Sequence, residues 1–600
     1  MASFVPLTTT TTTTTFSALS SSPSLKNPLH ISTVRNTRHF FKVSCQSSSN
    51  NHDQNPASKS TENPLNKFDR RNVLLGIGGY SAATLVPDPL ALSAPLSPNL
   101  TTCSKPTLPT GATPPDLNCC PPISTKILDF KPPPRPNKLR VRPATHLASD
   151  EYVKKFERAV QLMRELPDDD PRSYTQQANI HCAYCNGAYD QVGFPDLELD
   201  VHFSWLFFPF HRYYLYFFEK ILGKLIDDPT FAIPFWAWDS PASMTMPALY
   251  GNPNSSLYNA LRDAKHIPET GDVIYLDYDK TDPTTTVPER ISENLTIMYR
   301  QVVSGGTTAK LFMGSPYRAG ETDDPGAGSL ENTPHTQVHL WCGDRTQPNV
   351  EDMGNFYSAG RDPIFFGHHG NVDRMWSVWK TLGGKRKDFT DSDWLESSFL
   401  FYDENAQLVR VKVKDCLDEK NLGYVYQNLD IPWLKSRPTP RVSKASRKIK
   451  KAGVAMAADV PPAAQVFPTK LDRVVKAVVA RPKKSRTRKQ KDDEEEVLLI
   501  EGIELDKESF VKFDVFINED DETATRPGNS EFAGSFVNLP HKHKHGGKGK
   551  TKTKTNLRLG ITELLEDLGA EDDDGIVVTL VPRSGADNVT VGGAKIEFDS

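Results

Sequence analysis

Two groups of histidines constrain the fold and the chemistry of this chain of 600 residues more than any other feature. The first group comprises His181, His202 and His211, and the second comprises His335, His339 and His369. Residues 201–214 are apolar nearly all round, which predicts a buried helix. A lone buried histidine is usually a hydrogen-bonded core residue, whereas two matched groups favour metal binding. An all-imidazole donor set suits copper, zinc, iron or nickel rather than magnesium or calcium.

The second group has the spacing of one helix face. Thr333 suits the N-cap of a helix and Pro334 suits its first position. His335 and His339 are four residues apart, so a helix that begins here places both imidazoles on one face. Residues 336–338 lack the glutamate that a zinc protease places directly after its first histidine, so that interpretation loses its general base.

Residues 361–374 supply the rest of the second group. This segment contains the pair His368 and His369 and, one helical turn beyond His369, the carboxylate of Asp373. A carboxylate at this spacing is able to orient an imidazole from behind, as metal-bound histidines usually require. The sequence therefore predicts that Asp373 supports the metal site.

The first group does not fit a single regular helix. His202 and His211 are nine residues apart, which at about 100° per residue places them on opposite faces of one helix. Both reach one metal only if the helix begins after His202 or bends, and Pro209 offers a place for a bend. We expect His202 to lie at or before the start of the helix.

The first 94 residues predict two targeting segments. Residues 1–45 are rich in Ser and Thr and lack acidic residues, which is typical of a chloroplast transit peptide. Residues 46–94 contain Arg70-Arg71, a short apolar run and small residues before Ala94, as in a twin-arginine signal for the thylakoid lumen. Because the run is short and contains several Gly residues, we expect no stable membrane insertion.

A Pro-rich segment, 95–143, carries Cys103, Cys119 and Cys120. Clustered cysteines in a loop-like, exported segment predict disulfides rather than metal ligands, and the spacing alone leaves their pairing open. Residues 150–166 follow, with apolar side chains at intervals of three and four, so we expect the first clear helix there.

Together with the two histidine groups, five motifs resemble the plant polyphenol oxidases, which are chloroplast catechol oxidases related to tyrosinases and haemocyanins. The motifs are Pro234-Phe235-Trp236-Ala237-Trp238-Asp239, Asp362-Pro363-Ile364-Phe365-Phe366, Asp393-Trp394-Leu395, Tyr424-Val425-Tyr426 and Lys512-Phe513-Asp514-Val515. The resemblance implies a type-3 centre of two copper ions. One copper would be held by His181, His202 and His211, and the other by His335, His339 and His369. His368 would be a neighbour rather than a ligand.

The resemblance also implies covalent links between side chains. Cys185 matches a position that forms a thioether to the second histidine, His202, and this bond would hold His202 despite its awkward spacing. The disulfides that the resemblance implies are Cys103 with Cys120, and Cys119 with Cys182.

Three further residues acquire roles only through the resemblance. Glu331 matches a carboxylate that holds a water near the coppers and helps to deprotonate the substrate. Phe356 matches a bulky gate residue over the first copper. Thr336 occupies a position that has been linked to the hydroxylation of monophenols, where Asn is favourable, so the shorter Thr336 favours activity on diphenols.

The activity implied by the resemblance is oxidation of o-diphenols to o-quinones while oxygen is reduced to water. The expected partners are therefore small phenols and oxygen, and a net charge of −4 argues against nucleic acid. Two alternatives are a haemocyanin-like oxygen-binding protein and an oxidase specialised for one pigment precursor.

The composition changes after the expected dicopper catalytic domain, 95–435. Residues 436–496 are rich in Lys, Arg, Ala and Pro and end in an acidic run, which predicts a flexible, protease-sensitive linker. Residues 497–600 contain short strands separated by Gly, Asn and Pro, which predicts an antiparallel β-sandwich. Within it, the alternating His and Lys of residues 541–545 predict a solvated loop.

The expected architecture is thus a mainly α-helical catalytic core, with a four-helix bundle around the dicopper site, followed by a C-terminal β-sandwich. The resemblance implies that this sandwich covers the copper site. It would keep the enzyme latent until an activating protease cuts the linker or the domain is displaced.

Overall fold

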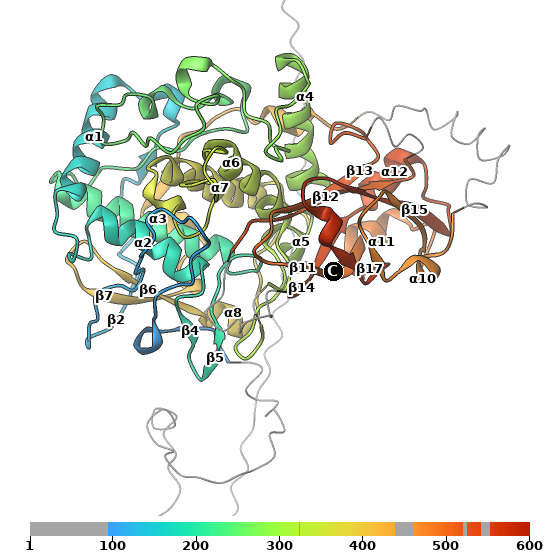
Figure 1. The fold of residues 1–600 in the computed structure, drawn as a ribbon, viewed down its shortest axis with the longest axis horizontal. Helices are drawn as coiled ribbons and strands as arrows, with labels where there is room; N and C mark the ends of the chain where they lie inside the picture. The colour runs from blue at the N-terminus through green and yellow to red at the C-terminus, as the bar shows by residue number, and fades with distance from the viewer. Residues whose placement is uncertain (1–93, 323, 439–459, 520–524, 542–551) are drawn as a thin grey trace, which may run out of the picture. The chain divides into compact units, whose positions relative to one another are not determined.

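The computed structural model describes residues 94–322, 324–438, 460–519, 525–541 and 552–600 (Figure 1). Residues 1–93, which hold the two expected targeting segments, and the basic stretch 439–459 lie outside this part of the chain. Within the described ranges, no helix is long and apolar enough to cross a membrane.

Four helices lie together in the N-terminal part of the described chain and carry His181, His211, His339, His368 and His369 (Figure 1). Helix α3 packs against α7, with Tyr214 of α3 meeting Phe365 and Phe366 of α7 at ring distances of 5.6 and 5.4 Å. The four helices are α2 (Tyr174–Cys185), α3 (Phe207–Leu225), α6 (Thr336–Cys342) and α7 (Ile364–Thr381). The helical core predicted from the sequence is confirmed.

The start of α3 resolves the spacing of the first histidine group. The helix begins at Phe207, so His202 lies in the preceding loop and His211 lies on the helix. Pro209 sits in the first turn, where a missing backbone N–H leaves no helical hydrogen bond unmade. Phe203 has a φ of +56°, in the left-handed region that non-glycine residues rarely adopt. The chain therefore turns sharply between the loop and the helix.

The helix expected at 150–166 is α1 (Asp150–Arg164). Its N-cap, Ser149, accepts a hydrogen bond from the N–H of Tyr152, and its buried face includes Phe156 and Val160. The other α- and π-helical elements of this part are α4 (Val287–Met298), α5 (Ala309–Met313), α8 (Ser392–Glu396) and π-helical turns at Tyr299–Ser304 and Glu331–His335.

Small sheets close the helical part. Strand β3 runs parallel to β8 and thereby joins the beginning of this part to its end. The order β1-β4-β5 makes one three-stranded sheet, and β2-β7-β6 makes another. These strands are β1 (Pro98–Asn99), β2 (Leu128–Asp129), β3 (Arg140–Arg142), β4 (Asp190–Gln191), β5 (Phe194–Glu198), β6 (Ser398–Tyr402), β7 (Leu408–Lys412) and β8 (Tyr424–Tyr426).

The C-terminal part contains two antiparallel sheets that share one hydrophobic core. One sheet has the order β10-β15-β12-β13, and the other has the order β14-β11-β16-β9 with β17 also paired to β11. The strands are β9 (Thr469–Lys470), β10 (Val475–Ala480), β11 (Glu495–Asp506), β12 (Val511–Ile517), β13 (Phe532–Asn538), β14 (Lys552–Gly560), β15 (Gly575–Pro582), β16 (Thr590–Val591) and β17 (Gly593–Asp599). Short helices α10 (Ala463–Val466), α11 (Arg488–Asp493) and α12 (Thr562–Leu568) accompany them.

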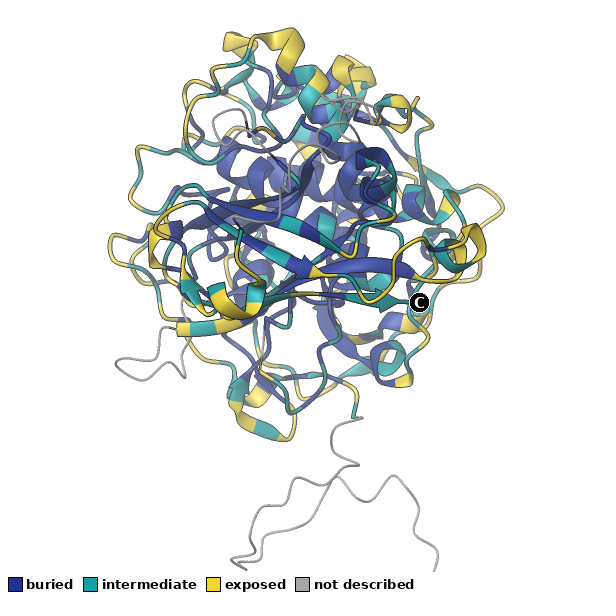
Figure 2. Cartoon of the chain, turned by 90° about the vertical axis from the view of Figure 1, so that its right-hand side faces the viewer, coloured by how far each residue is buried: buried dark blue, intermediate teal, exposed yellow. Residues whose placement is uncertain are grey.

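The linker expected at 436–496 is shorter than predicted, because residues 460–496 belong to the folded C-terminal part. Strand β10 lies inside the expected linker and pairs along its whole length with β15. The Lys- and Arg-rich composition misled the prediction, because Val475, Ala477 and Val479 alternate with exposed and half-buried residues and bury one face of the strand. In the view of Figure 2, the central strands and helices are buried, and exposed residues lie at the periphery, in loops and on outer helices.

Two disulfides attach the Pro-rich segment. Cys103 is joined to Cys120 and Cys119 to Cys182, with Cα–Cα distances of 5.8 and 5.7 Å, and these are the pairs implied by the resemblance. Because Cys182 lies on α2, the second bond ties the segment to the helix that carries His181.

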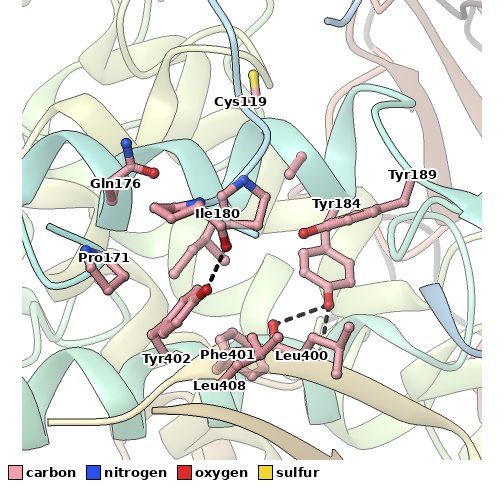
Figure 3. A pocket seen from close by; sticks show the side chains of 13 residues that line it. Cys119, Pro171, Gln176, Ile180, Tyr184, Tyr189, Leu400, Phe401, Tyr402 and Leu408 are labelled. Atoms are coloured by element: carbon pink, nitrogen blue, oxygen red, sulfur yellow. Dashed lines mark hydrogen bonds between the residues drawn. The ribbon is translucent and has the colours of Figure 1, made fainter. Parts of the chain in front are cut away.

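A pocket lies beside this attachment, where Tyr184 faces Leu400 and Phe401 of β6 (Figure 3). Cys119 and Ile180 also line it, and none of its lining residues is a histidine. The face of α2 that carries His181 is therefore a different one.

Candidate metal centre

The structure brings all seven histidines of the two sequence groups and of residue 368 into two adjoining clusters. One nitrogen from each of His181, His202 and His211 lies within 4.8 Å of the others, and the same holds for His335, His339, His368 and His369. The clusters meet where the rings of His211 and His369 stack at 4.1 Å and 11°. Every one of these side chains is buried.

Backbone carbonyls orient most of these imidazoles. The Nδ1 atoms of His181 and His211 lie 2.8 Å from the carbonyl oxygens of Phe356 and Phe207. His335 and His339 contact the carbonyls of Glu331 and Met353 in the same way, at 3.3 and 2.7 Å. A carbonyl only accepts hydrogen bonds, so Nδ1 carries the proton and Nε2 keeps a free lone pair.

Three of these four lone pairs have no protein partner among the described residues. Among the described residues, Nε2 of His181, His211 and His335 makes no hydrogen bond, although each atom is buried. His202 leaves both ring nitrogens unbonded, and Nε2 of His339 lies only 3.1 Å from Nε2 of His369. Buried polar atoms without partners are costly unless a ligand satisfies them, so this donor set fits metal ions in both clusters.

Burial also sets the charge of these rings. It lowers the pKa of His202 and His339 from 6.5 to about 3 and lowers the pKa values of the other five histidines well below 6.5. The imidazoles are therefore neutral at neutral pH, which is the form that binds metal.

Cys185 and Asp200 flank His202. The sulfur of Cys185, an oxygen of Asp200 and a nitrogen of His202 all lie within 4.8 Å of one another. The backbone N–H of His202 donates to Asp200 at 2.8 Å. Cys185 is buried as a free thiol, and burial raises its pKa well above 9. The position of Cys185 is compatible with the thioether expected from the sequence.

The backbone carbonyl of Glu331 lies next to the ring of His335, and its side chain reaches the residue that follows His202. Its Oε1 accepts a hydrogen bond of 2.7 Å from the N–H of Phe203, and its Oε2 has no hydrogen-bond partner among the described residues. Only 1% of the residue is exposed, and burial raises the pKa of its carboxyl group well above 4.5. The Thr336 hydroxyl donates to the backbone carbonyl of Glu331 at 2.9 Å, so Thr336 is held close to this acid. Thr333 has an extended backbone, but its hydroxyl makes no hydrogen bond among the described residues and α6 begins at Thr336, so the expected N-cap at Thr333 is wrong.

Phe356 covers the first cluster. Its ring lies 4.5 Å from the ring of His202 and 6.1 Å from that of His181. The ring of Phe356 also lies 6.0 Å from the ring of Phe203 and 5.4 Å from that of His541, which belongs to the C-terminal part. The expectation of a solvated loop is wrong for His541, which is only 3% exposed and stacks on Phe203 at 5.5 Å. Residues 542–551 lie outside the described ranges.

The prediction that Asp373 orients an imidazole is wrong. Its carboxylate contacts Arg212 at 2.5 Å and Arg142 at 3.3 Å, and it accepts hydrogen bonds from the hydroxyl groups of Tyr424 and Tyr426. Two buried guanidinium groups need an anionic partner, and Asp373 is the carboxylate that both share. Asp373 therefore stabilises the packing around α7 and does not orient a metal ligand.

Two contacts of this centre were not expected from the sequence. The indole N–H of Trp238 donates to Nδ1 of His368 at 3.1 Å, and His541 packs over Phe356. Trp238 lies in a motif that the sequence had marked only as a family resemblance. No local pattern could have paired residues this far apart in the chain.

Seven buried imidazoles, on four neighbouring helices, the π-helical turn before α6 and one loop, define a dinuclear metal centre. The central domain of tyrosinase matches residues 171–382, which contain all seven histidines. The polyphenol oxidase middle domain matches 388–439, and the chloroplastic polyphenol oxidase C-terminal domain matches 467–598.

Relatives with similar sequences cover nearly the whole chain. The chloroplastic polyphenol oxidase of Malus domestica is 58% identical over 96% of both chains. That of Vitis vinifera is 57% identical over 97% of this chain and 96% of its own. Aureusidin synthase of Antirrhinum majus is 54% identical over 88% of this chain and 93% of its own.

Solved structures of similar proteins superpose on this chain. Latent apple tyrosinase superposes with a TM-score of 0.73 at 61% identity, covering 79% of this chain and all (100%) of its own. Latent aurone synthase superposes with a TM-score of 0.77 at 44% identity, covering 84% of this chain and 99% of its own. The chain belongs to the plant polyphenol oxidase family, and its buried histidines form a type-3 dicopper site.

Proposed function

We propose that the chain is a catechol oxidase that converts o-diphenols to o-quinones while oxygen is reduced to water. One copper is held by His181, His202 and His211, and the other by His335, His339 and His369. The observation that carries this assignment is the convergence of buried imidazole nitrogens within each cluster, where Nε2 of His181, His202, His211 and His335 has no hydrogen-bond partner among the described residues. Bound copper supplies the electron-accepting and oxygen-reducing chemistry.

The protein contributes a dry site and a proton acceptor. Phe203, Phe207 and Phe356 surround His202, so an aromatic substrate meets apolar walls and little water. Glu331 offers an unbonded carboxylate oxygen beside the first cluster, where it takes up a phenolic proton directly or through a water. Because the Thr336 hydroxyl is engaged with the Glu331 carbonyl, it leaves the carboxylate without a side-chain partner and favours diphenols over monophenols.

We propose further that the C-terminal part is a β-sandwich that keeps the enzyme latent. The contacts of His541 with Phe203 and Phe356 support this, because they close the approach to His202. The latent forms among the related structures support it as well. An activating protease would cut between residues 438 and 460, and the targeting segments 1–45 and 46–94 would deliver the protein to the thylakoid lumen.

A second candidate is an oxidase specialised for one pigment precursor. Relatives named aureusidin synthase and (+)-larreatricin hydroxylase, from Larrea tridentata, are 54% and 50% identical to this chain and support it. Comparing kcat/KM for 4-methylcatechol with that for a larger polyphenol distinguishes the two candidates. A specialised enzyme would prefer the larger substrate.

Oxygen uptake tests the proposed function directly. The copper-loaded chain is assayed with 4-methylcatechol and with tyramine, before and after limited proteolysis between residues 438 and 460. Catechol oxidation that rises after cleavage, with little uptake on tyramine, is the expected result. Oxygen binding without turnover after cleavage would instead indicate a haemocyanin-like carrier, and a chain that binds no copper would contradict both.

A further inference from the structure

The second cluster holds four imidazoles, one more than a copper ion with an open position needs. The ring of His368 lies as close to the other three imidazoles of this cluster as they lie to one another. Its ring stacks on that of His335 at 5.2 Å and 20°, and lies 4.8 Å from that of His339 and 4.9 Å from that of His369. Proximity therefore does not explain why His368 would remain unbound.

The hydrogen bonds at Nδ1 separate His368 from His335 and His339, whereas Nδ1 of His369 has no hydrogen-bond partner among the described residues. Nδ1 of His335 and of His339 faces a backbone carbonyl, which only accepts, so these rings carry the proton on Nδ1 and a lone pair on Nε2. Nδ1 of His368 faces the indole N–H of Trp238, which only donates, at 3.1 Å. Nδ1 of His368 must therefore be the bare nitrogen, and its proton must lie on Nε2.

Trp238 is held firmly in this position. Its side chain is fully buried, and the next residue, Asp239, is tied to the helix that carries His368. Asp239 accepts hydrogen bonds from Asn371 at 2.9 Å and Arg374 at 3.1 Å, both on α7, and from the indole of Trp433 at 2.9 Å. The indole N–H and the imidazole thus belong to segments that are fixed to each other.

We infer that Trp238 is a positioning residue that keeps His368 off the second copper by fixing the His368 tautomer with the proton on Nε2. An N–H group has no lone pair to offer a metal, so three imidazoles remain and one coordination position stays open for oxygen and substrate. The inference rests on the proposed ligand set of His335, His339 and His369.

Trp238→Phe tests this assignment because it removes the donor and keeps an aromatic ring. His368 is then free to carry its proton on Nδ1 and to bind copper through Nε2. X-ray absorption of the copper-loaded full chain should show the mean imidazole count per copper rise from about three towards about three and a half. Turnover of 4-methylcatechol after cleavage should fall about 10- to 100-fold.

A matched control lies in the same motif. Trp236 is also fully buried, but its indole N–H donates to the carbonyl of Ser243 at 2.7 Å rather than to an imidazole. Trp236→Phe therefore removes an equivalent hydrogen bond and should leave the imidazole count unchanged. The double variant Trp238→Phe/His368→Phe should return the count to that of the wild type, because the extra ligand is gone.

Two outcomes would overturn the inference alone. One is an unchanged count in Trp238→Phe, and the other is a raised count that persists in the double variant, provided that wild type binds two coppers per chain. A wild type that binds no copper pair would overturn the dicopper assignment and this inference with it. Circular dichroism of each variant establishes that the chain is folded.

Discussion

The backbone N–H of Phe203 donates a 2.7 Å hydrogen bond to the carboxylate of Glu331. Phe203 directly follows His202 of the first cluster, while the backbone carbonyl of Glu331 lies 3.3 Å from the ring of His335 in the second. Glu331 thus contacts the residue that follows His202 and the ring of His335. This position supports the proposal that its carboxylate accepts a proton near the two metals.

Glu331→Gln should separate the proton chemistry of this residue from its packing. Glutamine keeps the size and can still accept from Phe203, but it cannot take up a proton. We expect catechol turnover to fall at least about 100-fold with copper content unchanged. Because burial raises the pKa of Glu331, wild-type activity should decline as the pH falls through that raised value, and the variant should lack this decline. Wild-type turnover in this variant would contradict the proposed role of Glu331 as a proton acceptor.

The buried histidines predict an acid-sensitive metal-free protein. The pKa of His202 and of His339 is about 3 in the folded chain, against 6.5 for an exposed imidazole. Between these values the unfolded chain binds more protons, so folding stability is full above pH 6.5 and falls as the pH drops towards about 3. Urea unfolding of the metal-free protein at a series of pH values measures this loss. In His202→Asn the free energy of unfolding should depend less steeply on pH. Identical slopes for the variant and the wild type would contradict the low pKa of His202.

An ionic contact between the two parts of the chain predicts a partly active, uncut variant. Lys512 of β12 lies 3.0 Å from Asp277 of the helical part and 2.9 Å from Asp514 of its own strand, and all three residues are buried. Removing one partner from a buried ionic cluster costs about 3–5 kcal/mol, and Asp514 would retain part of the attraction. We therefore expect Asp277→Asn to weaken the attachment of the C-terminal part and to raise oxygen uptake by the uncut chain.

The control for this variant is Asp282→Asn. Asp282 is half-exposed and pairs with Lys265 and Arg345, all within the helical part, so its loss should leave latency unchanged. The two variants should be equally active once the C-terminal part has been removed. Equal uptake by the two uncut variants would refute the proposed contribution of Lys512.

The arginine contacts of Asp373 predict a variant that loses stability rather than copper. Asp373→Asn would leave Arg142 and Arg212 without the carboxylate they share, at a cost of about 3–5 kcal/mol in the free energy of unfolding. Copper content per folded chain should match that of the wild type. Loss of copper at unchanged stability would instead restore the role in orienting an imidazole that the sequence suggested.

Local spacing predicted the parts of the site that lie within one element. The interval between His335 and His339, and the need for a helix start after His202, follow from helix geometry alone. Asp373 failed because its partners, Arg142 and Tyr424, come from strands that are remote in the sequence. The same holds for Trp238 and His368, which only the folded chain brings together.

The C-terminal part misled the prediction for a different reason. Composition alone marked residues 460–496 as linker, although β10 alternates buried and solvent-facing positions and pairs with β15. His541 looked solvated because it precedes a run of Lys and His, yet it packs on Phe356. In both cases charged neighbours in the sequence hid apolar contacts that form only across the fold.

The covalent connection between the two parts has a consequence for the kinetics of activation. While the chain is intact, the C-terminal part is present at an effective concentration on the order of millimolar, because it cannot diffuse away. A single cut between residues 438 and 460 turns it into a separate molecule that rebinds according to its total concentration. Activation would then depend on dilution as well as on cleavage, and a concentrated sample of cut enzyme would remain more inhibited than the same enzyme in the assay.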